Sequence, residues 1–182
     1  MNRRKFLGMG IGAVCGFAAG GAFAMQMKPR MPFRLSLAQW SFNKALFGKE
    51  MDNLDFAKTA HDLGFEGLEY VNSFFKDKAN DKAYLGQMKK LASDNNVKSL
   101  LIMCDGEGFL GDPDCGKRTI AVENHYRWLE AAKFLGCHSI RVNAHSEGTY
   151  EEQQKLAADG LAKLSEEAKK YDLNVIVENH GG

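Results

Sequence analysis

The sequence predicts an α/β protein of the (β/α)8 TIM-barrel type, truncated after its fifth strand. Short apolar runs alternate with segments of helical periodicity in units of roughly 30 to 40 residues, which indicates a parallel sheet with helical crossovers. A doubly wound sheet of five strands would be complete at this length. The loop after the first strand, however, lacks the glycine-rich phosphate grip of that fold. A complete barrel takes ~250 residues, so we expect five of its strands here.

The expected strands each end in polar or aromatic residues. They cover 33–38, 67–71, 97–103, 138–143 and 175–177. The last run, Val175 to Val177, is β-branched throughout and predicts a strand that is buried on both faces. Because ligands of parallel α/β folds bind outside the carboxyl ends of the strands, the residues after each run are candidate site residues.

The expected helices are marked by capping residues. Asp52 and Asp81 are candidate N-caps of the first two helices. Periodic apolar residues predict a third helix over 117–135. Thr149 and Glu152 have the spacing of a capping box, which predicts the start of a fourth helix that runs to about residue 171.

The N-terminal residues are expected to lie outside the domain. Residues 1–24 have a basic start with paired Arg3 and Arg4, an apolar stretch rich in glycine and alanine, and a small-x-small ending. This pattern resembles a twin-arginine signal and predicts export to the bacterial periplasm, with residues 25–32 as a linker. The alternative is an uncleaved anchor. The stretch is short and weakly apolar, so we expect cleavage and no stable membrane span.

The composition is that of a globular protein, with 45% hydrophobic residues, 26% charged residues and a net charge of +1. Without a basic excess, nothing predicts a nucleic-acid partner. Three cysteines follow the signal, namely Cys104, Cys115 and Cys137. Their odd number and irregular spacing predict free or buried thiols rather than a disulfide framework or a zinc motif.

Five residues are candidate site residues. Glu178 follows an apolar strand, which favours a functional carboxylate over a solvated one. Trp40 either stacks on a ligand or packs, and Glu69 either lines the mouth of the barrel or pairs with a lysine. His145 either contacts a substrate or caps the next helix. His180 would share a face with Glu178 in an extended strand, although the two glycines that follow it favour a turn.

The segment from Asp105 to Asp114 is rich in acidic residues and glycine. It lacks the Asp-x-Asp-x-Asp-Gly order of a calcium loop. The sequence therefore predicts a solvated loop.

Four segments together resemble one family. They are Trp-Ser-Phe at 40–42, Gly-Leu-Glu-Tyr-Val-Asn at 67–72, Ile-Arg-Val-Asn-Ala-His at 140–145 and Val-Glu-Asn-His-Gly-Gly at 177–182. In order and spacing they resemble the xylose isomerase-like TIM-barrel superfamily, and within it the sugar phosphate isomerase/epimerase group. The resemblance covers about residues 33–182.

The resemblance implies a metal-dependent isomerase or epimerase of a sugar or sugar-like polyol. Glu178 matches the glutamate that ends the fifth strand in this family, where it is a metal ligand and faces a second glutamate across the substrate. The implied cation is Mn²⁺ or Mg²⁺, with Zn²⁺ or Co²⁺ as alternatives. The implied reaction moves a proton next to a carbonyl through an enediolate. The remaining ligands, an Asp, a His and a second Glu, normally come from strands six to eight.

Other functions remain open at this point. A lyase or dehydratase can use the same site, because an enediolate can also eliminate a group. A non-catalytic carbohydrate-binding protein and an inactive truncated product are further alternatives. An open sheet would leave its first and fifth strands as apolar edges, which predicts self-association.

Overall fold

The protein contains one five-stranded parallel sheet. The computed structural model describes residues 33–178, so the expected signal (1–24), the linker (25–32) and His180 lie outside the described residues. The strand order is β1-β2-β3-β4-β5, which confirms the expected partial barrel. The strands are β1 (Ser36–Ala38), β2 (Gly67–Val71), β3 (Lys98–Cys104), β4 (Ser139–Val142) and β5 (Asn174–Val177).

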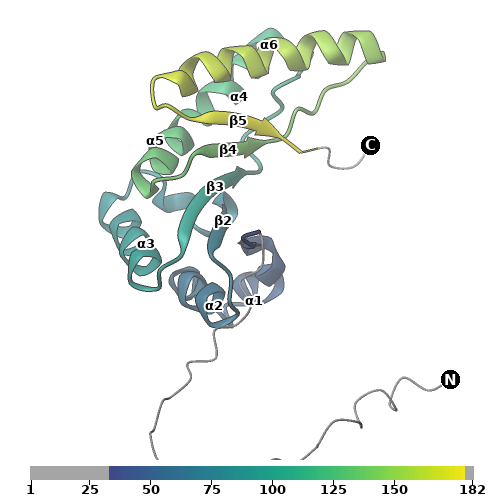
Figure 1. Ribbon diagram of the computed structural model, residues 1–182. Coiled ribbons are helices and arrows are strands. Elements are labelled where there is room, and N and C mark those ends of the chain that lie inside the picture. The colour runs from purple at the N-terminus through teal and green to yellow at the C-terminus, as the bar shows by residue number, and fades with distance from the viewer. Residues whose placement is uncertain (1–32, 179–182) are drawn as a thin grey trace, which may run out of the picture. The chain divides into compact units, whose positions relative to one another are not determined.

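Helices connect the strands, and α3, α5 and α6 lie along one side of the sheet, while the strands turn progressively from β2 to β5 (Figure 1). The α-helices are α1 (Asn43–Phe47), α2 (Phe56–Asp62), α3 (Lys82–Asp94), α4 (Cys115–Asn124), α5 (Tyr126–Leu135) and α6 (Tyr150–Lys169). Four short 3-10 helices are η2 (Gln39–Phe42), η3 (Asn53–Asp55), η4 (Asn72–Phe74) and η5 (Lys76–Lys78).

The predicted caps are confirmed. The Asp52 carboxylate accepts the backbone N–H of Leu54 and begins η3, which leads directly into α2. Asp81 accepts the N–H of Tyr84 at the start of α3. The hydroxyl of Thr149 and the carboxylate of Glu152 form the reciprocal capping box of α6. Each cap satisfies backbone donors that the first helical turn leaves without a partner.

The predicted third helix is wrong in one respect, because it is two helices that meet at His125. The N–H of His125 bonds the Val122 carbonyl, which is a tighter turn than the α-helical one. Its Nδ1 lies 2.7 Å from the Ala121 carbonyl oxygen. The ring is 1% exposed, and this burial lowers the pKa of His125 from its ordinary value. Apolar periodicity continues through the break, so it did not mark the junction.

The core lies between the sheet and its helices. Alternate strand residues face the helices, such as Leu68 and Tyr70 of β2, which are almost fully buried. The ring of Phe56 meets that of Tyr70 edge to face at 6.0 Å, and Phe75 meets Trp128 in the same way at 5.4 Å. The other face of each strand is left to line the interior of the barrel.

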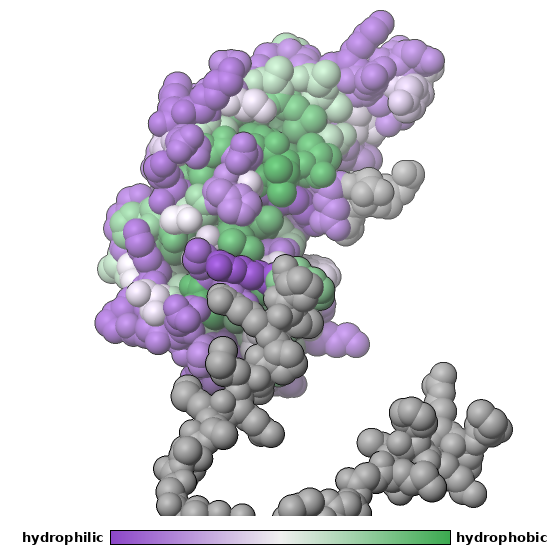
Figure 2. Space-filling view, viewed as in Figure 1, coloured by the Kyte–Doolittle hydropathy of each residue, from purple (hydrophilic) through white to green (hydrophobic). Residues whose placement is uncertain are grey.

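The prediction that β5 is buried on both faces is wrong. Only Val175 is partly buried and packs against the core, whereas Ile176 is 39% exposed and Val177 is 48% exposed. The reason is that β5 pairs with β4 alone in the described sheet. Figure 2 shows apolar surface where β4 and β5 lie in Figure 1. Self-association through this edge stays a prediction.

The first strand is shorter than expected, since Phe33 and Leu35 are exposed and only Ser36–Ala38 pairs with β2.

The three described cysteines are free, as predicted. Burial raises the pKa of Cys137 to about 12, so this thiol stays protonated. Within residues 33–178, no helix has the length and apolar character needed to cross a membrane.

Candidate functional site

The carboxyl ends of β3, β4 and β5 bring polar side chains to one face of the sheet. Arg141 of β4 is in register with Met103 of β3 and Ile176 of β5, so these three side chains share a face. Side chains alternate, so the residues two positions further along return to that face. These residues are Asp105, Asn143 and Glu178.

Arg141 is the centre of this cluster. Its Nη1 donates to Asp105 Oδ1 and to Asn143 Oδ1, each at 3.1 Å, and its Nη2 lies 2.7 Å from Glu178 Oε2. Asn143 Nδ2 also donates to Asp105 Oδ1 at 2.8 Å. Three consecutive strand ends are therefore joined through one guanidinium group, here called the Arg141 cluster (Asp105, Arg141, Asn143 and Glu178).

The cluster combines a buried cation with accessible carboxylates. The Arg141 side chain is only 9% exposed, whereas Asp105 is 34% exposed and Glu178 is 51% exposed. The buried Nε of Arg141 has no hydrogen-bond partner in the described structure. One positive charge faces two negative charges, so the cluster has a net charge of −1 and presents carboxylate oxygens toward solvent.

The ends of β1 and β2 are organised differently, by neutral groups. Gln39 is fully buried, and its Oε1 accepts the N–H of Val71 at 2.9 Å. Its Nε2 donates to Asn53 Oδ1 at 2.5 Å, and Asn53 Nδ2 donates to the Tyr84 hydroxyl at 2.9 Å. We call Gln39, Asn53 and Tyr84 the amide relay. It connects the sheet to the beginning of α3.

Asn72 joins the two groups of strand ends. Its Nδ2 donates to the Asp105 carbonyl at 2.9 Å and to Glu107 Oε1 at 3.0 Å, and its Oδ1 accepts the Asp105 N–H. Glu107 is 3% exposed and also pairs with Arg127 at 2.6 Å. The prediction of a solvated acidic loop is therefore wrong for Glu107, since these bonds satisfy a buried carboxylate.

Trp40 follows β1 and Glu69 lies in β2, and both are expected to contact a substrate. Trp40 is 49% exposed, and its ring centroid lies 6.1 Å from those of Phe47 and Phe74. Glu69 of β2 accepts a hydrogen bond from the Ser36 hydroxyl rather than pairing with a lysine. A groove of about 460 Å³ next to Phe47 and Phe74 is lined by both aromatic and polar side chains.

His145 lies on the loop between β4 and α6. It is exposed, and its ring centroid is 4.3 Å from that of Phe109. Its carbonyl accepts the N–H of Gly111, so the loops after β3 and β4 are joined. Thr149 and Glu152, not His145, cap α6.

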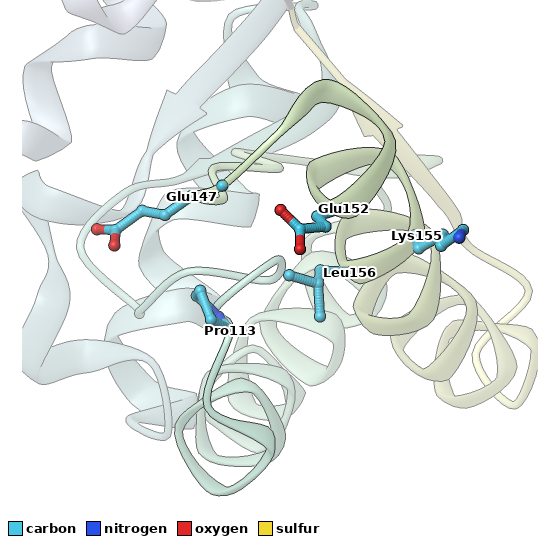
Figure 3. Close-up of a pocket in the computed structure, with 6 residues that line it drawn as sticks. Pro113, Glu147, Glu152, Lys155 and Leu156 are labelled. Atoms are coloured by element: carbon cyan, nitrogen blue, oxygen red, sulfur yellow. The ribbon is translucent and has the colours of Figure 1, made fainter.

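A second hollow of about 490 Å³ lies at the start of α6. In Figure 3, Glu152 and Leu156 point toward Pro113, while Glu147 and Lys155 point away. Glu152 is already used by the capping box. None of the expected site residues lines this hollow, so it adds nothing to the site.

The donor chemistry of Glu178 fits a hard cation, but the described residues do not complete a metal centre. Among residues 33–178, no three His, Cys, Asp or Glu side chains are grouped as ligands. Glu178 offers a half-exposed carboxylate at a strand end, which suits one ligand position. The thiol of Cys104 does not, because it is buried and this burial raises its pKa well above the ordinary value.

Comparison with known proteins decides the family. A model described as the xylose isomerase-like TIM barrel matches residues 57–182, more than half of the chain. The chain belongs to the xylose isomerase-like TIM barrel family. A comparison with curated proteins gives no significant match.

Solved structures show the same fold. D-psicose 3-epimerase with D-tagatose from Clostridium cellulolyticum H10 is 15% identical, with a TM-score of 0.64 over 79% of this chain and 51% of that one. The IolI protein with a zinc atom is 17% identical, with a TM-score of 0.63 over 80% and 51%. The probable 3-DHS dehydratase AsbF from Bacillus anthracis is 17% identical, with a TM-score of 0.59 over 82% and 53%. The chain spans about half the length of these structures.

Sequence reasoning found one member of the Arg141 cluster and missed three. Glu178 was singled out, whereas Asp105, Arg141 and Asn143 were not. A signal was present, because Arg141 and Asn143 are two residues apart at the end of a strand and must share a face in this family's sheet. The position of Asp105 beside them depends on the register between β3 and β4.

Proposed function

We propose that this chain belongs to a metal-dependent isomerase or epimerase that acts on a sugar or sugar-like polyol. The observation that carries the proposal is Glu178, a half-exposed carboxylate beyond β5 that pairs with Arg141. Family membership supports it, since the family model matches through this residue. A carboxylate held beside a substrate carbon is suited to removing a proton next to a carbonyl.

We assign Glu178 two roles, as proton-transferring base and as ligand of a divalent cation. Mn²⁺ or Mg²⁺ is the preferred cation, and Zn²⁺ or Co²⁺ is the alternative. Such an ion, when bound, makes the proton next to the carbonyl more acidic and stabilises an enediolate. Residues 33–178 supply this one ligand, so the rest of the centre has to come from outside them.

Four further residues are proposed substrate contacts. Trp40 offers a half-exposed indole ring to a sugar, and His145 offers an exposed imidazole ring on the loop after β4. Glu69 carries a carboxylate on the inner face of β2 and is oriented by Ser36. His180 follows Glu178 and lies outside the described residues.

The proposed proton transfer is tested by isotope exchange, with the protein that the complete reading frame encodes. The protein is incubated with Mn²⁺ in heavy water, with D-fructose or D-tagatose, and deuterium at the carbon next to the carbonyl is followed by NMR. We expect exchange that Glu178→Gln removes and that Glu166→Gln, at an exposed position on α6, leaves intact. Exchange that survives Glu178→Gln would contradict the proposed role.

A dehydratase is the second candidate, because one structure of the same fold is a probable dehydratase. Both reactions begin with removal of a proton next to a carbonyl, so exchange alone does not separate them. Mass spectrometry does, since elimination gives a product that is lighter by one water molecule. An epimerase gives a product of unchanged mass.

We also propose export to the periplasm, on the basis of the basic and apolar residues 1–24. Cell fractionation with and without a functional twin-arginine pathway tests this. Replacement of Arg3 and Arg4 by lysine is expected to retain the protein in the cytoplasm. Export that is unchanged by this replacement would reject the proposed route.

A further inference from the structure

Arg141 pairs with a carboxylate that is still open to solvent. Nη2 of Arg141 lies 2.7 Å from Oε2 of Glu178. The Glu178 side chain is 51% exposed, so the carboxylate remains accessible while it is paired.

Arg141 itself has little freedom to move. Its side chain is 9% exposed, and Nη1 is tied to Asp105 and Asn143 on the two strand ends beside it. A guanidinium group stays protonated in proteins. Any cation that binds Glu178 therefore meets a fixed positive charge on the other side of the same carboxylate.

We propose that Arg141 is a positioning residue that limits how strongly Glu178 binds a divalent cation. It pairs with the Glu178 carboxylate, and its charge repels the incoming ion. This inference rests on the proposed function, because it takes Glu178 as a metal ligand. The consequence is that a neutral residue at 141 strengthens cation binding, whereas another cationic residue does not.

The expected gain in cation affinity follows from the short distance between the two positive charges. Arg141 and a cation bound to the same carboxylate would be separated by only a few ångströms, where like charges repel even at a dielectric constant well above that of a dry protein. Loss of the ion pair between Arg141 and Glu178 acts in the opposite direction, but the Glu178 side chain is half-exposed and solvent screens that pair. The electrostatic effect is therefore expected to prevail.

The test is a Mn²⁺ titration of the complete protein without sugar, followed by the electron paramagnetic resonance signal of free Mn²⁺. Arg141→Gln is neutral and keeps an amide that can donate to Asp105. We expect it to tighten Mn²⁺ binding by about tenfold, and Arg141→Lys to stay within about threefold of the unmodified protein. Arg141→Met gives a second neutral variant in case the glutamine variant fails to fold.

Two controls separate charge from structure. Arg118 is equally buried, with a side chain that is 9% exposed, and pairs with Asp159 at 2.7 Å away from the cluster. Arg118→Gln should leave Mn²⁺ affinity unchanged. In the double variant Arg141→Gln/Glu178→Gln, the gain should disappear, because the ligand itself has been removed.

The outcomes are distinct. Weaker or unchanged Mn²⁺ binding in both neutral variants overturns the proposal, as does an equal gain in Arg141→Lys. A gain that persists without Glu178 places the cation elsewhere and also overturns it. Failure of the proposed reaction appears separately, as absence of deuterium exchange, and leaves the Mn²⁺ titration interpretable on its own.

Discussion

The two halves of the barrel mouth are stabilised by different chemistry. At the ends of β1 and β2, the amide relay connects fully buried Gln39 through neutral hydrogen bonds to Asn53 and Tyr84. At the ends of β3, β4 and β5, the Arg141 cluster connects charged groups, and its carboxylates remain partly exposed. In the neutral half Gln39 is closed to solvent, whereas in the charged half the two carboxylates are open to it.

The difference follows from the cost of burial. A buried amide needs only hydrogen-bond partners, whereas a buried carboxylate also loses the solvation of its charge. Glu178 keeps half of its surface in solvent and pairs with Arg141, so its charge is both compensated and accessible. The neutral half is suited to fixing the scaffold, and the charged half is suited to binding and chemistry.

The largest loss of stability is expected from a steric change in α6, next to the loop that follows Asp105. A Cβ on Gly160 of α6 would overlap the carbonyl oxygen of Leu110, in the loop that follows Asp105. Gly160→Ala should therefore lower the free energy of unfolding by about 3 kcal/mol, although alanine favours helix. Hydrogen exchange should rise at the ends of β3 and β4 and stay low at β1 and β2.

Gly86 of α3 provides the matched control, since a Cβ there meets no atom within 4 Å. Gly86→Ala should stabilise the protein by about 0.5–1 kcal/mol through helix propensity alone. Equal free energies of unfolding for the two variants in chemical denaturation would show that the Leu110 carbonyl does not pack against Gly160 of α6 as described.

A smaller loss is expected when the neutral half is disrupted. Gln39→Leu keeps the apolar volume but leaves the N–H of Val71 and the side chain of Asn53 without their partner. An unsatisfied buried donor costs about 1–3 kcal/mol, and the partly exposed Asn53 can bond to solvent instead, so we expect a loss of about 2 kcal/mol. Because no charge is involved, the loss should be the same at low and high salt. A strong salt dependence would argue against a neutral relay.

The smallest loss is expected from Asp105→Asn in the charged half. This substitution removes the negative charge that faces Arg141 at 3.1 Å and keeps a side chain of the same shape. Asp105 is about one-third exposed, so solvent screens the pair and the loss should be about 1 kcal/mol. High salt should reduce it further. Denaturation at two salt concentrations checks this, and a salt-independent loss would place the effect in hydrogen bonding instead.

Much of the architecture was predictable because it depends on local pattern. The caps at Asp52, Asp81 and Thr149 were identified from residue type and spacing, and they form as expected. The break at His125 was not predicted, because apolar periodicity continues across it. The burial of β5 was also predicted wrongly, since a strand's sequence does not reveal how many neighbours it has in the sheet.

The sequence by itself determined the order of strands and helices, the family, and Glu178 as a candidate site residue. These depend on periodicity and on residues adjacent in the chain. Only the tertiary structure decided that Asp105, Asn143 and Glu178 share one arginine, and that Gln39 is buried against β2. Apart from the local contact between Arg141 and Asn143, these contacts join residues more than thirty positions apart, so they depend on strand register, which no local pattern encodes.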